Sequence, residues 1–251
     1  MRVEFLGTAG FHPNAHRHTA GILISDAAQS DMQSDAFLLD AGTGTWRLIG
    51  RDLPPRLHIF LTHAHLDHIA GLTYLLDVCL NRDLEVTLYG DRATLHAAQT
   101  SLFASPLFPL PFAHPTREIV PGETFEVAGA QVSSFLLTHP NNCLALRFDW
   151  PQKSLAYITD TVGDDRYFPL IKGVDVLIHE RNFPDHLREI AVVSGHCTSA
   201  DLVRAARFSG ARQVIATHFN PLTPTDPLLE DDVYAQIPGV IAARDELCLE
   251  L

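Results

Sequence analysis

Residues 61–72 read LTHAHLDHIAGL, and this run is the part of the 251-residue chain that indicates most about its fold and chemistry. An apolar, strand-like segment, LHIFLT at 57–62, leads into it, and a stretch with helical periodicity follows it. Between them, four side chains with metal-ligand chemistry fall within six residues: His63, His65, Asp67 and His68. His63 and His65 should project to one side of an extended turn, because side chains there alternate with a period of two.

This polar turn predicts a metal site. Asp67 and His68 stand at the mouth of the following helix, with Asp67 placed to cap it, so both can point into one cleft. Neutral imidazole nitrogen and carboxylate oxygen suit zinc and similar divalent ions. Four donors exceed the needs of one tetrahedral catalytic ion, which predicts two adjacent ions. The alternative is a histidine-rich surface turn that binds no metal.

The motif His63-x-His65-x-Asp67-His68 resembles the signature of the metallo-β-lactamase-fold hydrolases, and the likeness extends along nearly the whole chain. The segments LLTHP, AYITDT and IATHFNP resemble later motifs of that family, in the same order, and contribute His139, Asp160 and His218. Each of these three residues follows an apolar, β-rich run, so each would be delivered at the end of a strand. Alone, each is an ordinary polar strand terminus; together with the first motif they predict one centre.

The resemblance implies a centre of two divalent ions, with zinc as the first choice and manganese or iron as alternatives. It assigns one ion to His63, His65 and His139. It assigns the other ion to Asp67, His68 and His218, with Asp160 and a hydroxide bridging the two. Anionic bridges offset the repulsion between two dications, and the paired charges lower the pKa of a bound water toward neutrality.

Two further stretches resemble one branch of that family, the ribonuclease Z group of transfer-RNA 3′-end endonucleases and related phosphodiesterases. They are LIHERNF at 177–183 and the segment 194–219, and the opening LGTAGFHPNAHRHTAGILI resembles the same group. By position, the resemblance assigns the proton of the leaving group to Glu180 and His196, which join Asp67 as catalytic residues. A histidine held by a carboxylate is a suitable acid for a leaving alkoxide. The plainer alternatives are, for Glu180, a contact that supports a metal-ligand residue or a salt bridge at the strand end, and, for His196, a helix-capping or packing role.

The distance from His139 to Asp160 and the charge of the chain bear on the substrate. This stretch is just long enough for two strands and a turn, so the long arm with which many ribonuclease Z members grip transfer RNA does not fit there. A formal net charge of −12 also repels polyanions, whose binding rests on Lys and Arg. The sequence therefore predicts a phosphodiesterase that acts on a small or cyclic phosphodiester through a metal-bridging hydroxide. A long nucleic acid is disfavoured without being excluded.

Three other functions stay open: hydrolysis of carboxyl derivatives such as lactones or thioesters, a transfer-RNA endonuclease without the arm, and a non-catalytic metal-binding module. Arg17 could hold a substrate phosphate through a bidentate contact or lie in a solvated loop. Phe103–Phe112, in a proline-rich segment that cannot be regular, could wall the substrate, although packing in the core or in a dimer is favoured. His179 faces away from Glu180 on its strand and is expected to be structural.

Composition and periodicity predict an α/β (α+β) fold in a single metallo-β-lactamase-like domain over 1–251. Two mixed β-sheets with helices outside both, a four-layer αββα sandwich, would bury the many apolar strands. Strands are expected at 3–7, 21–25, 36–40, 57–62, 85–90, 124–129, 131–138, 144–150, 154–159, 174–180, 212–218 and 246–251. Helices are expected at 67–80, 91–103, 198–210 and 230–245, with a hairpin connection at 27–35.

Location and partners follow from simpler signals. No apolar run reaches the roughly 18 residues needed to cross a bilayer, and MRVEFLGTAG has no basic-then-apolar leader, so the cytoplasm is expected. Four scattered cysteines favour buried thiols over a disulfide framework or a thiolate cluster. The expected partner is a small anionic substrate and no membrane, and a homodimer stays an open alternative.

Overall fold

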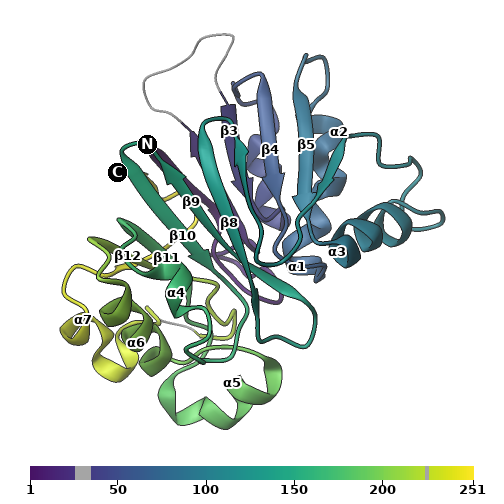
Figure 1. Cartoon of the computed structure of the whole chain (residues 1–251). Helices are drawn as coiled ribbons and strands as arrows, with labels where there is room; N and C mark the ends of the chain where they lie inside the picture. The colour runs from purple at the N-terminus through teal and green to yellow at the C-terminus, as the bar shows by residue number, and fades with distance from the viewer. Residues whose placement is uncertain (26–34, 224–225) are drawn as a thin grey trace. The chain divides into compact units, whose positions relative to one another are not determined.

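The computed structural model describes residues 1–25, 35–223 and 226–251 (Figure 1). Their contacts divide the chain into two compact units. Unit 1 comprises Met1–Ile119 with Arg244–Leu251, and unit 2 comprises Val120–Ala243. The single domain expected over 1–251 stays a prediction. The hairpin connection expected at 27–35 lies, apart from Asp35, outside the described residues.

Unit 1 is built on a mixed sheet with seven strands in the described residues. Their order across the sheet is β14 (Cys248–Glu250), β1 (Arg2–Gly7), β2 (Gly21–Ser25), β3 (Asp35–Leu39), β4 (Arg56–Phe60), β5 (Glu85–Gly90) and β6 (Thr116–Glu118). The pairs from β14 to β3 are antiparallel, whereas β3 to β6 run parallel. Parallel strands place their carboxyl ends at one edge of a sheet, where ligand sites form, and the turn that holds His63 and His65 follows β4 at that edge.

The helical segment after β4 is interrupted, so the continuous helix expected over 67–80 is wrong. It consists of α1 (Leu66–Ile69), a 3-10 turn η2 (Ala70–Tyr74) and α2 (Leu75–Val78). The interruption has a tertiary cause. The backbone N–H of Gly71 donates to the Ala41 carbonyl at 2.7 Å, and the N–H of Ala41 donates to the His68 carbonyl at 2.8 Å. The backbone groups of this segment therefore bind the chain after β3 in place of their own helix.

The helices of unit 1 show that one predicted cap is wrong. Apart from the interrupted segment, they are a 3-10 helix η1 (Thr43–Leu48), α3 (Arg92–Ala97) and its continuation in a wider, π-type turn, η3 (Ala98–Leu102). Asp67 is not the cap that the sequence predicts, because His65 occupies the N-cap position of α1 and Asp67 lies in its first turn. A side-chain cap is present in α3, where the Asp91 carboxylate accepts the backbone N–H of Thr94 at 2.8 Å.

Unit 2 is built on a second mixed sheet, also with seven strands in the part of the chain described. Their order is β13 (Ile241–Ala242), β12 (Gln213–Thr217), β11 (Val176–Glu180), β10 (Lys153–Ile158), β9 (Cys143–Trp150), β8 (Ala130–Leu137) and β7 (Thr124–Val127). β10 to β13 run parallel, whereas β7 to β10 pair antiparallel, so β8 points the same way as β10, β11 and β12. Between His139 and Asp160 lie β9, a short turn and β10, as the sequence predicts.

The helices of unit 2 confirm one prediction and overturn part of another. They are α4 (Phe168–Ile171), η4 (Asp185–Leu187), α5 (Arg188–Ser194), α6 (Ser199–Ser209), η5 (Glu230–Asp232) and α7 (Val233–Gln236). Thr198 caps α6 in a capping box with Asp201, and Gly210 ends it with a φ of 64°, as predicted. The helix expected over 230–245 is wrong beyond Gln236, because Gly239 turns the chain with a φ of 81° and Ile241–Ala242 then pair with β12.

Each unit buries its own core. In unit 1, side chains of β3, β4 and β5 cluster with those of the interrupted helix. Phe103 joins this core, and the rings of Phe108 and Phe112 pack against it at centroid distances of 4.8 and 5.1 Å. The segment from Phe103 to Pro115 contains no helix or strand, as its prolines predict. Its phenylalanines therefore serve core packing, which was the favoured expectation.

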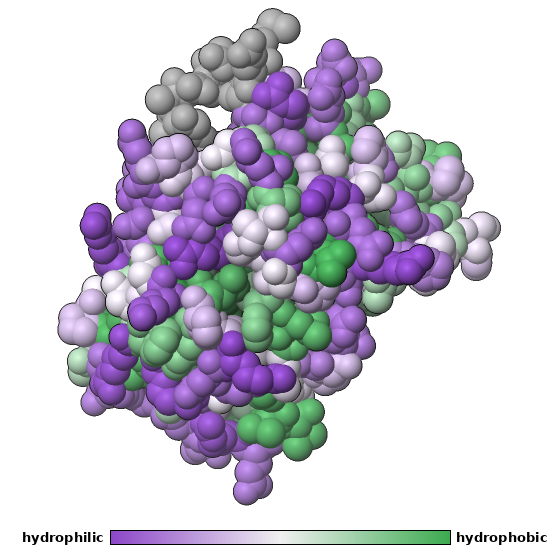
Figure 2. All heavy atoms as spheres, in the orientation of Figure 1, coloured by the Kyte–Doolittle hydropathy of each residue, from purple (hydrophilic) through white to green (hydrophobic). Residues whose placement is uncertain are grey.

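In unit 2, α6 and α7 pack on β12, where Leu202, Val203 and Val233 meet Val214 and Ala216. Helix α5 differs, because its apolar side chains Ile190, Val192 and Val193 are exposed, and Figure 2 shows hydrophobic side chains gathered over it. Two mixed sheets with flanking helices confirm the predicted fold class.

Candidate metal centre

Asp40, directly after β3, organises the ligand residues of unit 1. Its side chain is fully buried and its backbone φ is 56°. The carboxylate accepts hydrogen bonds from the backbone N–H of Thr62 at 2.8 Å and from the Thr62 hydroxyl at 3.0 Å. It also lies 2.8 Å from Nδ1 of His68. One buried carboxylate therefore joins the ends of β3 and β4 to the start of α1.

These contacts decide which nitrogen of two histidines carries the proton. The single hydroxyl proton of Thr62 goes to Asp40, so Thr62 Oγ1 accepts the Nδ1–H of His63 at 3.1 Å. His68 donates its own Nδ1–H to Asp40. In both rings Nε2 therefore carries the lone pair that a metal ion requires.

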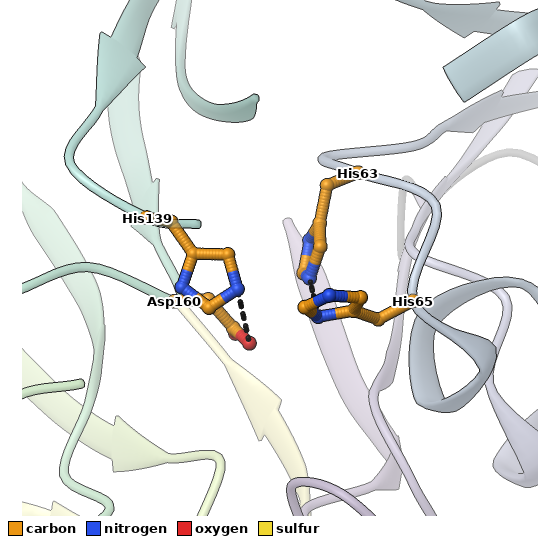
Figure 3. Close-up of side chains that lie close together, drawn as sticks. All are labelled: His63, His65, His139 and Asp160. Carbon is orange, nitrogen blue, oxygen red and sulfur yellow. Dashed lines mark hydrogen bonds and ion pairs between the residues drawn. The ribbon is translucent and has the colours of Figure 1, made fainter. Parts of the chain in front are cut away.

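His65 and Asp67 lie beside these rings. Nδ1 of His65 is 2.9 Å from Nε2 of His63, so the two imidazoles meet on one side of the turn, as the period of two predicts (Figure 3). Asp67 Oδ2 lies 3.4 Å from Nε2 of His68 and accepts the backbone N–H of Phe11 at 2.7 Å. His63 and His68 are fully buried, whereas His65 is half-buried.

In unit 2, the carboxylate of Asp160 lies between two histidines. Its Oδ1 is 3.2 Å from Nε2 of His218, and its Oδ2 is 3.9 Å from Nε2 of His139, the contact that Figure 3 draws. Oδ1 also accepts the hydroxyl proton of Thr159 at 2.6 Å. Each carboxylate oxygen thus faces a different imidazole, which is the arrangement that a bridging carboxylate needs.

His139 is oriented by the turn after α5. Its Nδ1–H donates to the Gly195 carbonyl at 3.0 Å, which leaves the lone pair on Nε2. Burial lowers the pKa of His139 below its usual value, so this ring is neutral near pH 7. Gly195 has a φ of 82°, and a Cβ there would lie 2.6 Å from His139 Nδ1 and 2.5 Å from Cδ of Pro140. Only glycine fits so close to this ligand candidate.

His218 is held by Asn182, which follows β11. The Asn182 amide lies 3.3 Å from Nδ1 of His218 and donates to the His218 carbonyl at 3.0 Å. His218 itself adopts a φ of 55°, which is uncommon for a residue with a side chain. The amide therefore supports a strained backbone and an imidazole together.

Glu180 and His196 form the pair that the resemblance singles out. Glu180 is fully buried; its Oε1 accepts the backbone N–H of Thr161 at 2.6 Å, and its Oε2 lies 3.2 Å from Nδ1 of His196. The His196 ring is 5.5 Å, between centroids, from both His139 and His218. A donor atom from each of Glu180, His196 and His218 lies within 4.8 Å of the others. Because Glu180 holds Nδ1 of His196, Nε2 is the atom that can pass a proton outward.

The donor chemistry of both sets fits divalent zinc-like ions. Imidazole Nε2 or Nδ1 atoms and carboxylate oxygens supply every proposed contact, without thiolates, and carboxylate or carbonyl groups hold the opposite ring nitrogens of His68 and His139. A buried carboxylate such as Asp160 requires a positive charge or hydrogen-bond donors beside it, and a bound cation would supply that charge.

Other sequence predictions fall outside this cluster. The Arg17 guanidinium donates to the Thr8 hydroxyl at 2.6 Å. His179 is fully buried, with Nδ1 donating to the Glu180 carbonyl and Nε2 accepting the Tyr167 hydroxyl at 2.7 Å, so it is structural, as predicted. Sequence reasoning missed Asp40, although it carries the same signal as Asp160, a polar residue directly after an apolar strand.

A family model described as "Beta-lactamase superfamily domain" matches residues 36–219, which is most of the chain. The chain belongs to the metallo-β-lactamase-fold hydrolases. The matched segment includes every ligand candidate named above, from His63 to His218.

Curated relatives of this family member are named as ribonucleases. Ribonuclease BN of Erwinia tasmaniensis is 28% identical over 88% of this chain and 89% of its own length. Ribonuclease Z of Archaeoglobus fulgidus is 25% identical over 100% of this chain and 98% of its own length.

Solved structures agree with the fold. The metallo-β-lactamase fold protein YhfI from Bacillus subtilis superposes with a TM-score of 0.78 at 23% identity, covering 99% of this chain and 98% of its own. A diphosphatase from the PhnP family gives 0.71 at 20% identity, covering 100% and 97%. Zn²⁺-bound PqqB from Methylobacterium extorquens gives 0.69 at 20% identity, covering 100% of both chains. Across residues 1–25, 35–223 and 226–251, every helix is too short or too polar to span a bilayer.

Proposed function

We propose that this chain is a dinuclear metal-dependent phosphodiesterase whose substrate is a small or cyclic phosphodiester. The ions, zinc in the first place, would be held by His63, His65, His139, Asp67, His68 and His218, with Asp160 between them. When bound, two such ions supply a water that is acidic enough to react near neutral pH.

The single observation that carries the phosphodiester assignment is the Glu180–His196 pair. A buried carboxylate 3.2 Å from Nδ1 accepts the Nδ1–H and orients the ring, so the opposite nitrogen can deliver a proton to a leaving oxygen. Expulsion of an alkoxide from phosphorus needs such a proton. Glu180 is itself held by the Thr161 N–H, so it fixes the orientation of the His196 ring.

The names of the relatives support the same chemistry. Ribonucleases Z and BN are nucleic-acid hydrolases by name, and the PhnP-family neighbour is a diphosphatase by name. All three names describe attack at phosphorus. The zinc-bound neighbour PqqB supports zinc as the first choice of metal.

Two features of this chain favour a small anion over a long RNA. The span from His139 to Asp160 holds two strands and a short turn, with no inserted arm. The net charge of −12 opposes a polyanion at distance, whereas bound dications attract a small phosphodiester locally. The cytoplasm stays the predicted location.

The first test is hydrolysis of bis(p-nitrophenyl) phosphate by the zinc- or manganese-loaded protein. Chelation should abolish turnover and added metal should restore it. Asp67→Ala should remove both turnover and part of the bound metal, measured by elemental analysis of the same sample. Metal-loaded protein that hydrolyses lactones or thioesters and no phosphodiester would establish the carboxyl-ester alternative instead.

The second test varies the leaving group. p-Nitrophenolate is a stable anion that departs without a proton, whereas a nucleoside 2′,3′-cyclic phosphate expels an alkoxide. His196→Ala should therefore lower kcat about 10²–10⁴-fold on the cyclic phosphate and far less on bis(p-nitrophenyl) phosphate, at unchanged metal content. Equal losses on both substrates would remove the acid role from His196. Cleavage of a transfer-RNA precursor at rates above those for the cyclic phosphate would favour the endonuclease alternative.

A further inference from the structure

Phe11 is an exposed aromatic side chain beside a candidate ligand of unit 1. Its side chain is 79% exposed, the second-largest exposure among the large hydrophobic residues of the described chain. Its backbone N–H donates to Asp67 Oδ2 at 2.7 Å. The Phe11 Cα therefore lies within about 4.2 Å of a candidate ligand oxygen, since N–Cα bonds are about 1.46 Å long. Leu66, which precedes Asp67, is 68% exposed.

The backbone at Phe11 is strained. Its φ is 63°, and the N–H of His12 donates to the Gly10 carbonyl at 2.8 Å across it, the pattern of a γ-turn with positive φ. Such turns are rare, and positive φ is unfavourable for any residue with a Cβ. A glycine at this position would carry no such penalty. The strained backbone presents an aromatic ring to solvent. Because the ring is not buried, it adds little to the stability of the fold.

Backbone hydrogen bonds close the loop on both sides of Phe11. The N–H of Ala9 donates to the His18 carbonyl at 2.9 Å, and the N–H of Asn14 donates to the Arg17 carbonyl at 2.9 Å. The His12 ring packs edge-on against Phe11 with a centroid distance of 5.2 Å. These contacts restrict the backbone beside the ring and pack the His12 ring against it, and fewer conformations before binding lower the entropy cost of binding to it.

We propose that Phe11 is a specificity-determining residue, an aromatic platform on which a planar aromatic group of the substrate stacks while its phosphodiester faces Asp67. This rests on the proposed function and deepens it, because it selects phosphodiesters whose retained ester group, the one that does not leave, is aromatic, such as a nucleobase-bearing or aryl ester, over those whose retained group is aliphatic. An offset-stacked pair of rings gains attraction beyond simple burial, and base–aromatic stacking tolerates different bases.

Two substrates with one leaving group isolate this effect. Bis(p-nitrophenyl) phosphate and methyl p-nitrophenyl phosphate both release p-nitrophenolate, so only the retained ester differs, aromatic in the first and aliphatic in the second. Phe11→Leu keeps an apolar side chain and removes the ring. We expect it to raise KM for the aromatic diester about 5- to 10-fold with kcat nearly unchanged, and to leave the methyl diester unaffected. Phe11→Trp should retain the preference.

Phe11→Gly separates recognition from folding. It removes the ring and relieves the positive φ, so the preference should be lost while the melting temperature stays the same or rises. Leu107→Ala is the matched control, because Leu107 is 74% exposed in the same unit and its backbone N–H donates to the Ala104 carbonyl, whereas that of Phe11 donates to Asp67. This substitution should leave KM and kcat unchanged for both diesters.

A binding measurement keeps the two proposals apart. Calorimetry on metal-loaded protein should show that Phe11→Leu weakens the binding of p-nitrophenyl phosphate about 5- to 10-fold and leaves the binding of methyl phosphate unchanged. If the wild type turns over neither diester yet shows this binding pattern, the phosphodiesterase proposal fails and the platform stands. If the variants change the affinity for both phosphates equally, or for neither, Phe11 is not a platform.

Discussion

The two units present their ligand candidates in opposite ways. In unit 1 they come from one turn, His63 to His68, whose geometry is set by a few covalent bonds and by Asp40. In unit 2 they follow separate strands: β8 leads to His139, β10 to Asp160, β11 ends at Glu180 and β12 leads to His218. These strands point the same way, so their carboxyl ends meet at one edge. Local sequence builds the first set, and sheet register builds the second.

The two sets of ligand candidates should differ in how strongly a single substitution disturbs them. The unit 1 set depends on one buried carboxylate that fixes the protons of two imidazoles. The unit 2 set spreads this work over several groups: the Gly195 carbonyl holds His139, Asn182 holds His218 and Glu180 holds His196. A single conservative change should therefore cost more in unit 1 than in unit 2.

The largest effect is expected from Asp40→Asn. Asparagine tolerates the φ of 56° and can accept from Thr62, but its NH₂ group cannot accept the Nδ1–H of His68. The proton then moves to Nε2, where a ligand lone pair is needed. Metal affinity should fall about 10- to 100-fold, measured by competition with a chromogenic chelator.

Asp91→Asn is the control for that change. Asp91 is also a buried carboxylate of unit 1, and it accepts the backbone N–H of Thr94 at the start of α3. It should leave metal affinity unchanged. Equal losses from both substitutions would mean that general damage to unit 1, and not the proton on His68, weakens binding.

The next effect probes unit 2 through Gly195→Ala. The new Cβ would lie 2.6 Å from His139 Nδ1, so the imidazole must move from its position. Metal affinity should fall about 10-fold, within the range seen when ligand orientation is disturbed. Gly210→Ala carries a similar penalty, with a φ of 64°, but nothing lies within 4 Å of its Cβ. It should lower stability alone, and a loss of metal affinity there would contradict the contact argument.

The same contrast explains what could be predicted from the sequence. The turn at His63–His68 is contiguous, so its residues and spacing predict it directly. The unit 2 candidates could be predicted from their resemblance to motifs of the family, and His139, Asp160 and His218 also follow apolar strands, a signal that marks Asp40 as well and was overlooked there. Phe11 leaves no pattern, since its importance lies in a positive φ and a hydrogen bond to a distant residue.

Errors in secondary structure have a similar origin. The helix expected over 67–80 has the right periodicity, but hydrogen bonds to Ala41 interrupt it. Residues 241–242 read as helix, yet they add an edge strand to β12 after the turn at Gly239. In each case a partner far along the chain outweighs local propensity.

A smaller effect should come from His179→Gln, and it depends on pH. Burial lowers the pKa of His179 below its usual value near 6.5, so the folded chain keeps this ring neutral beside Tyr167. Below pH 6.5 the unfolded chain binds a proton that the folded chain does not. The free energy of unfolding then falls by about 1.4 kcal/mol per pH unit until the lowered pKa is reached.

Glutamine does not titrate, so His179→Gln lacks this pH-dependent loss of stability. The difference in free energy of unfolding between wild type and His179→Gln should therefore be largest above pH 6.5 and should shrink as the pH falls. Denaturant unfolding of chelator-treated protein measures it without interference from metal binding. A difference that stays constant with pH would place the titration of His179 outside this window.

The smallest effects come from two helix caps, and they ask whether the units unfold together. Asp91→Ala removes the cap of α3 in unit 1, and Thr198→Ala removes the cap of α6 in unit 2; each should cost about 1 kcal/mol. If the chain is a single cooperative domain, both variants shift one and the same transition in calorimetry, by similar amounts. Two transitions, each shifted by only one of the variants, would contradict the single domain. They would also imply that the ligand set made by one turn can form while the set made by sheet register is unfolded.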